Sequence, residues 1–465
     1  MAGDLELNEE VVVLGTRADE IGTRAALSME QAGGRVLHRF GSRVMVMEMS
    51  ATTEDKIRRS VRGASFTPRP SRLSDSTRQA LDTTGYLGLQ ALRMRKRSAY
   101  RQAKENRPLA GQAWDAPDAQ CPDTLFAEDP KPEFESLLAD DMPAPSPTSA
   151  FLIGSVAVGL IIVEGPTDDL KFTDEEQAKV VAEVQNGLSW LGTQDPRANV
   201  SWSYDIQIIT LDTPPGPASL PGAEREKLWR DPAMEQLGYG PGMDRVRTYV
   251  QDLRSNLHTR WGYCAYFTKY PTGHFAYASL GGPRLVMQYS NDGWGPDNID
   301  RVFAHETGHI FEAPDEYASS GCNCGGAWGY LKTPNGNCAN CAEGGGVACI
   351  MRSNEWAMCD YTQTHFGWRD QDNDGVLDPD DPVEHPRWWL FRWMCRRYPN
   401  LCRFLATPAA EEEEDLVPMS LLAQVLSAED LENLEARIQQ EQDAYLESIA
   451  RHIDKASEEL RSAIR

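Results

Sequence analysis

One short stretch, residues 301–317 (RVFAHETGHIFEAPDEY), constrains the chain more than any other. Its centre is the pentapeptide HETGH, with histidines at its first and last positions. Residues four apart on an α-helix project from the same face, so His305 and His309 can bind one metal ion together. Glu306 lies beside the first histidine, where its carboxylate can hold a water molecule and accept its proton. The alternative is a surface helix that carries two polar histidines by chance.

A third ligand is expected nearby, because a catalytic zinc usually has three protein ligands and one open position. Asp315 lies six residues after His309, and Pro314 ends the helix because the residue before a proline avoids helical geometry. The pattern resembles the extended motif of the metzincin metallopeptidases, H-E-x-x-H-x-x-G-x-x-H/D. Glu312 stands where that family has glycine, so positive φ there would cost about 1 kcal/mol or more. Glu316 is a second candidate for the third ligand.

The resemblance to metzincins covers residues 151–368 and implies a zinc-dependent endopeptidase. In that function the two histidines and Asp315 hold Zn²⁺, and Glu306 is the general base for the attacking water. Metzincins also have a methionine turn below the zinc, and Met351 is our candidate for it. Two other functions stay open: a non-catalytic binding protein stabilised by calcium and zinc, or a processing peptidase of narrow specificity that acts on one partner protein.

We expect an α+β fold in which the metzincin-like domain has an α/β-type upper subdomain, a mixed sheet and an active-site helix. Helical spacing of apolar residues predicts helices at 173–191 and 244–259. Apolar runs and alternation predict strands at 151–163, 200–208, 261–267, 274–279 and 284–289. In metzincins an edge strand before the zinc helix pairs with the extended substrate. The resemblance therefore implies that residues 274–279 bind a polypeptide.

Residues 1–70 predict a small domain with the order strand, helix, strand, strand, helix, which indicates a ferredoxin-like layout. The stretch GGRVLHRFGSRVMVMEM at 33–49 resembles the inhibitory propeptides of subtilisin-type peptidases. That resemblance implies an intramolecular chaperone or inhibitor, and hence a zymogen. An ordinary accessory domain fits the same residues equally well.

Residues 71–150 are expected to be a linker with a basic stretch between Arg93 and Arg107. This stretch could dock onto the acidic catalytic domain, be cleaved on activation, or form a solvated helix face. Cys121 follows in a segment rich in Pro and Asp. Its thiolate could occupy the open position of the zinc and keep the enzyme latent, or it could be a free cysteine or part of a disulfide.

Six of the ten cysteines crowd into an insert at residues 322–359. One interpretation is three disulfides that staple a loop rich in Gly and Asn, and the other is a structural zinc bound by four thiolates. Such density suits an oxidising, extracellular compartment. The N-terminal residues MAGDLE lack the apolar run of a secretory signal, so the compartment stays open.

Residues 369–382 predict a calcium-binding loop. Acidic residues occupy loop positions 1, 3, 5, 9 and 12, and Gly375 occupies position 6, as in EF-hand-type loops. Aspartate at position 12 makes the loop resemble those of dockerin or thrombospondin repeats. Carboxylates this close repel one another unless a cation neutralises them, although a solvated acidic loop is the alternative. The expected ligands are Asp370, Asp372, Asp374, the Val376 carbonyl, Asp378 and Asp381.

The last part of the chain predicts two further segments. Residues 383–410 mix arginines with aromatic residues and could pack on the acidic body or lie at a membrane interface. Residues 411–465 predict a helical tail whose leucine spacing would allow self-association. The net charge of −24 argues against a nucleic-acid partner. The longest apolar run, at 151–163, is too short to be a transmembrane segment.

Overall fold

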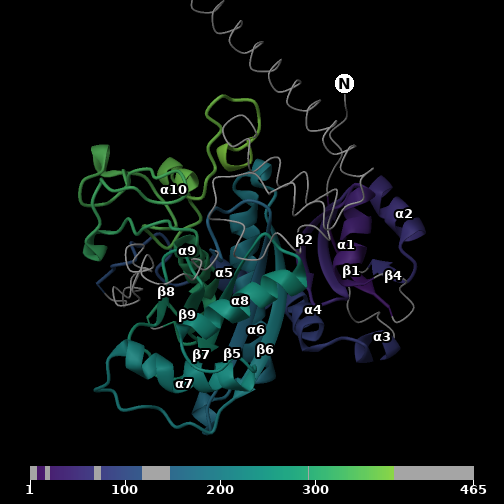
Figure 1. Ribbon diagram of the computed structural model, residues 1–465, viewed down its shortest axis with the longest axis horizontal. Helices are drawn as coiled ribbons and strands as arrows, with labels where there is room; N and C mark the ends of the chain where they lie inside the picture. The colour runs from purple at the N-terminus through teal and green to yellow at the C-terminus, as the bar shows by residue number, and fades with distance from the viewer. Residues whose placement is uncertain (1–7, 16–20, 67–74, 118–146, 292, 382–465) are drawn as a thin grey trace, which may run out of the picture. The chain divides into compact units, whose positions relative to one another are not determined.

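A mixed nine-stranded sheet organises the computed structural model, which describes residues 8–15, 21–66, 75–117, 147–291 and 293–381 (Figure 1). The strand order is β4-β1-β3-β2-β6-β5-β7-β9-β8. Cys121 and the segments 383–410 and 411–465 lie outside the described residues. The strands are β1 (Asn8–Leu14), β2 (Arg35–Phe40), β3 (Val44–Met49), β4 (Ala64–Phe66), β5 (Ser155–Glu164), β6 (Ser201–Thr210), β7 (Trp261–Thr268), β8 (Ala276–Ala278) and β9 (Arg284–Gln288).

The N-terminal strands continue the sheet of the rest of the chain. The elements follow the predicted order, with α1 (Gly22–Gln31) after β1, α2 (Ala51–Ser60) after β3, and β4 added at the end. Strands β4, β1, β3 and β2 pair antiparallel, and β2 then pairs parallel with β6. At this junction His38 is buried, with Nδ1 2.8 Å from Tyr204 Oη and Nε2 2.8 Å from Ser189 Oγ. The two regions therefore share one hydrogen-bonded sheet.

Helices occupy much of the segment in which the sequence led us to expect a linker. They are α3 (Asp75–Gln79), α4 (Thr83–Arg95) and α5 (Ser98–Glu105). Helix α4 begins at Asp82, whose side chain accepts a hydrogen bond from Gly85 N at 2.7 Å. Its buried face contacts β6, where Ile206 N donates to Thr84 Oγ1 at 2.8 Å. Two glycines, Gly85 and Gly88, interrupt the apolar pattern of this face, which explains why the sequence did not reveal the helix.

Strand β5 lies at the centre of the described core, parallel to β6 and β7. All its residues after Ser155 are buried, as expected for a parallel strand covered on both faces. Helix α6 (Asp174–Thr193) begins with a capping box, in which Thr173 and Glu176 exchange hydrogen bonds. It crosses α9 (Ile299–Ile310) so closely that a Cβ on Gly187 would collide with the backbone of Asp300. This close crossing holds α9 against the core.

The sequence did not predict α7 (Gly222–Gln236), because Pro232 and the flanking prolines and glycines resemble a loop. The next helix, α8 (Met243–Leu257), matches its prediction, and α10 (Asp360–His365) follows the insert. Within α7, Glu226 is buried and pairs with Arg284 at 3.1 Å and with Arg230 at 2.6 Å. The ion pair with Arg284 links α7 to β9. Among the described residues, no helix combines the length and apolar character that crossing a membrane requires.

Candidate metal centre

Helix α9 carries the pentapeptide of the predicted metal site, and all of its residues from Val302 to Ile310 are buried. The helix ends just after His309, and Glu312 adopts φ +62°, in the left-handed region. Glycine adopts this conformation without strain. Residue 312, which corresponds to the glycine of the metzincin motif, adopts positive φ here although it is a glutamate. Ala313 N closes the turn on Gly308 O at 3.0 Å. The chain then reverses toward the helix.

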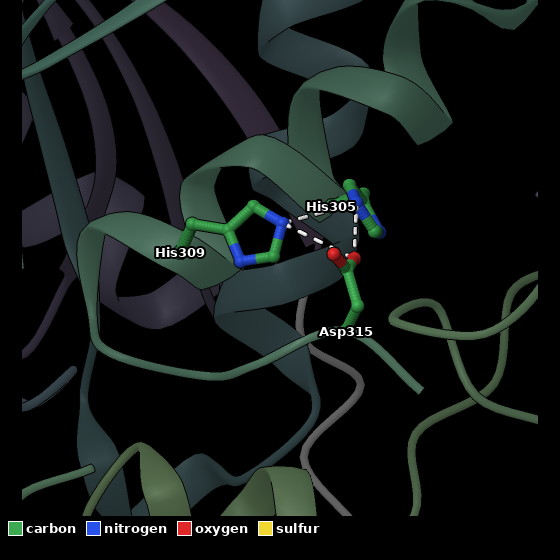
Figure 2. A group of neighbouring side chains, drawn as sticks. All are labelled: His305, His309 and Asp315. Carbon is green, nitrogen blue, oxygen red and sulfur yellow. Dashed lines mark hydrogen bonds and ion pairs between the residues drawn. The ribbon is translucent and has the colours of Figure 1, made fainter. Parts of the chain in front are cut away.

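This reversal brings Asp315 to the two histidines, as Figure 2 shows. The Nε2 atoms of His305 and His309 are 3.1 Å apart. Asp315 Oδ1 lies 3.3 Å from Nε2 of His305 and 3.5 Å from Nε2 of His309. Ligand atoms at about 2.0–2.1 Å from a tetrahedral zinc are about 3.3–3.4 Å apart. The three side chains therefore match the ligand spacing of such an ion, and the structure groups their donor atoms as one set that could hold a metal ion.

Backbone carbonyls orient both imidazole rings. His305 Nδ1 lies 3.0 Å from Ile350 O, and His309 Nδ1 lies 2.7 Å from Ala313 O. A ring that donates its Nδ1–H to a carbonyl presents the lone pair of Nε2 to a metal. Each histidine thus has the outer hydrogen bond that metal-ligating histidines usually have.

Trp114 is a part of this centre that the sequence did not reveal. Its Nε1 donates to Ile350 O at 2.6 Å, the same carbonyl that His305 contacts, and its ring centroid lies 5.2 Å from that of His305. The side chain is fully buried. A tryptophan in a segment rich in Pro and Asp was the only available signal, and no spacing rule connects it to a motif almost two hundred residues later.

The electrostatics of the centre favour the metal-binding protonation states. Burial lowers the pKa of His305 below its ordinary value, which keeps the ring neutral. Burial would raise the pKa of Asp315, but the two histidines hold it below its ordinary value, so the carboxylate stays ionised. Neutral imidazole and ionised carboxylate are the forms that bind a metal ion.

Glu306 and Met351 are both buried at or against α9. Glu306 is fully buried on α9, next to the first histidine. Met351 is also buried and lies against α9, because a Cβ built on Gly308 would be only 2.6 Å from Met351 Sδ. The methionine thus packs on the helix turn between His305 and His309.

Glu316 does not face the two histidines. Its carboxylate accepts hydrogen bonds from Cys359 Sγ and Thr362 Oγ1, both at 3.0 Å, and from Asn337 Nδ2 at 2.6 Å. Burial raises the pKa of Glu316. Asp315, and not its neighbour, is therefore the third member of the histidine centre.

The cysteine-rich insert forms two disulfides, Cys322–Cys338 and Cys324–Cys341. Cys349 and Cys359 are buried thiols. The insert therefore fits neither sequence interpretation fully, because the structure forms neither a third disulfide nor a cluster of four thiolates from these six cysteines. The sulfurs of the last two cysteines instead contact side chains: Cys349 Sγ lies 3.3 Å from Thr362 Oγ1, and Cys359 Sγ lies 3.0 Å from Glu316 Oε1.

The acidic loop places three of its aspartates together: the carboxylates of Asp370, Asp372 and Asp374 lie within 4.8 Å of one another. Gly375 has φ +93°, as a sharp turn at loop position 6 requires. Asp378 instead pairs with Arg369 and accepts a hydrogen bond from Gln371 N at 2.8 Å. Asp381 is buried, and Val376 N donates to Asp374 Oδ1 at 2.7 Å.

Strand β8 occupies the predicted place at the edge of the sheet, antiparallel to β9. It is shorter than the predicted strand, covering Ala276–Ala278. Just after it, Gly281 N donates to His309 O at 2.9 Å. The sheet edge and the second histidine are therefore joined by a direct hydrogen bond.

Neither a protein-family model nor a curated protein matches the sequence. Among solved structures, the chain is similar to metalloproteinase-II from Bacteroides fragilis, with 13% sequence identity and a TM-score of 0.26. The match covers 57% of this chain and 60% of that one. At this TM-score the similarity carries no argument about the fold or function of the present chain.

Proposed function

We propose that the protein is a metal-dependent peptidase, and specifically a zinc endopeptidase. The observation that carries the proposal is the convergence of two imidazole Nε2 atoms and one carboxylate oxygen at 3.1–3.5 Å. The Nδ1 atoms of both rings contact backbone carbonyls, which fixes the direction in which each Nε2 atom points. Three protein ligands with one open position are typical of a catalytic zinc, whereas structural zinc sites are closed by four.

The chain supplies a base beside this centre. Zn²⁺ held by His305, His309 and Asp315 would provide a Lewis acid that polarises a carbonyl group and acidifies water. Glu306 would accept the proton of the attacking water and pass it to the leaving amine of the cleaved peptide bond. Its full burial on α9 limits access of bulk solvent to the carboxylate.

A polypeptide is the substrate class that suits the sheet edge. Strand β8 has β9 on one side only, and its three residues are fully buried. An extended peptide would add to its other side through backbone hydrogen bonds once the segment covering that edge moves aside. The bond from Gly281 N to His309 O would place such a peptide next to the metal ligands. This supports an endopeptidase more than an esterase for small substrates.

The test compares Glu306→Gln with wild type in casein and peptide-library hydrolysis, with and without a chelator, and measures bound zinc in both proteins. Glu175→Gln, at an exposed side chain, is the matched control. We expect Glu306→Gln to keep its zinc and lose at least 100-fold in turnover, the scale of a lost general base. Equal activity of the two proteins would contradict the mechanism.

Wild-type protein that binds zinc but cleaves nothing in the library would instead favour the non-catalytic binding protein. Cleavage confined to one partner protein would indicate the narrow processing peptidase.

We also propose that Asp370, Asp372 and Asp374 bind Ca²⁺ in a structural site. Three close carboxylates around a glycine turn support this role. Calcium should raise the Tm of wild type and leave the Tm of Asp372→Asn with Asp374→Asn unchanged. An equal rise in both proteins would argue against the loop.

A further inference from the structure

A second buried donor cluster lies beside the histidine centre. It comprises Glu316, Cys349 and Cys359, whose carboxylate oxygen and sulfur atoms lie within 4.8 Å of one another. Glu316 and Cys349 are fully buried, and Cys359 is 3% exposed. Two thiols and a carboxylate are a recurrent set of zinc ligands.

The hydroxyl of Thr362 completes a four-cornered arrangement. Thr362 Oγ1 lies 3.0 Å from Glu316 Oε1, 3.3 Å from Cys349 Sγ and 3.5 Å from Cys359 Sγ. Glu316 Oε1 and Cys359 Sγ are 3.0 Å apart. A tetrahedral zinc with bonds of about 2.0–2.3 Å separates its ligand atoms by about 3.3–3.8 Å. The cluster needs only a small expansion to surround such an ion.

The charge balance of the cluster also indicates a cation. Every hydrogen-bond partner of the Glu316 carboxylate among the described residues is neutral, namely a thiol, a hydroxyl or an amide. A buried carboxylate without a positive partner costs several kcal/mol. Asn337 Nδ2 holds Oε2 at 2.6 Å, which turns Oε1 toward the sulfurs. Outer hydrogen bonds of this kind orient the carboxylate ligands of metal ions.

The pairing of the other cysteines separates this cluster from the disulfides. The four cysteines at 322–341 form two disulfides with each other, whereas Cys349 and Cys359 stay reduced. Cys359 N donates to Cys349 Sγ at 3.4 Å, an orientation in which that sulfur accepts, as a thiolate ligand would.

From this geometry we propose that Glu316, Cys349 and Cys359, with Thr362 or a water at the fourth corner, bind a structural Zn²⁺. Metal binding would release the protons of both thiols. The site would stabilise the backbone next to the histidine centre. Glu316 directly follows Asp315, and Cys349 directly precedes Ile350, whose carbonyl contacts His305. The proposal is independent of the peptidase function.

The test uses the full chain, stripped of metal and reloaded with Co²⁺. A thiolate bound to Co²⁺ gives a charge-transfer band in the near ultraviolet, which ligands such as His and Asp do not give. We expect this band in wild type and in His309→Ala. In the double variant Cys349→Ser with Cys359→Ser, we expect the band to disappear. We also expect this variant to bind one equivalent of zinc per chain less than wild type. Cys264→Ser, at a buried thiol of β7, is the matched control and should keep both.

Alkylation of wild type covers the case in which the double variant fails to fold. In partly denaturing urea, zinc should slow the alkylation of two thiols relative to chelator-treated protein, and peptide mapping should assign them to Cys349 and Cys359. Absence of the band in wild type, its persistence in the double variant, or a mapped Cys349–Cys359 disulfide would each overturn the proposal. Loss of peptidase activity alone would not bear on it.

Discussion

Arg107→Ala should destabilise the protein strongly, because it removes one partner of a buried ion pair at the start of α9. Arg107 Nη1 and Nη2 donate to the two carboxylate oxygens of Asp300 at 2.8 and 3.2 Å. The side chains of Arg107 and Asp300 are 4% and 0% exposed. The pair connects α9, the helix that carries the two histidines, to the basic stretch that ends after α5.

The magnitude follows from what remains around Asp300. Removing one partner of a buried pair costs about 3–5 kcal/mol. Lys104 Nζ would still lie 3.1 Å from Asp300 Oδ2, and Asn186 Nδ2 would still donate at 2.7 Å. We therefore expect the lower end, a loss of about 3 kcal/mol in the free energy of unfolding. The control is Arg97→Ala, in the same basic stretch, whose pair with Glu175 is 57% and 77% exposed. It should cost about 0.5 kcal/mol or less.

Urea unfolding of wild type and both variants measures these losses, and its pH dependence adds a second check. Burial would raise the pKa of Asp300, but Lys104 and Arg107 outweigh it and lower the pKa. A carboxylate with a lowered pKa stabilises the fold above its unfolded pKa of about 4 and loses that contribution as the pH falls further. The difference between wild type and Arg107→Ala should therefore be full at pH 7 and shrink below about pH 4. A loss under 1 kcal/mol at pH 7 would refute the reasoning.

Three further substitutions test the surroundings of the centre. Gly308→Ala would place its Cβ 2.6 Å from Met351 Sδ, so the free energy of unfolding should fall by about 1–3 kcal/mol. A competing chelator should also remove zinc more easily. An unchanged free energy of unfolding would show that the methionine is not packed there. Glu312→Gly should stabilise the fold by about 0.5–1 kcal/mol, because φ is +62°, and a lower Tm would contradict this. Replacing Cys322 and Cys338 by serine opens a loop of sequence separation 16 and should lower the free energy of urea unfolding by about 3 kcal/mol. An unchanged free energy of unfolding would show that the loop is ordered without this disulfide.

Local spacing predicted the histidine centre, and long-range packing explains what it missed. The shared face of His305 and His309 follows from helix periodicity, and the approach of Asp315 follows from the break that Pro314 imposes. The contact of Trp114 with Ile350 O joins segments far apart in the sequence, which no local pattern records. For the same reason, the cluster of Glu316 with two cysteines was not anticipated as a unit.

The fold shows the same division. Apolar patterns predicted the strands and helices around β5 and α6. Burial on both faces gives β5 a continuous apolar run, and the buried residues of α6 recur at helical spacing. The pairing of β2 with β6 depends on two regions meeting in space, and the helix with Pro232 in its interior has no periodic apolar stripe. The domain boundaries, the ferredoxin-like and metzincin-like layouts, the zymogen, the compartment and the self-association of the tail stay predictions.

The metal centre is tested most directly by anomalous X-ray scattering at the zinc absorption edge, from crystals of protein purified with zinc. We predict a peak about 2.0–2.2 Å from Nε2 of His305, Nε2 of His309 and a carboxylate oxygen of Asp315. It should vanish in His309→Ala crystals. Crystals of zinc-loaded protein with no peak among these three side chains, or with a fourth protein ligand closing the site, would contradict a catalytic zinc.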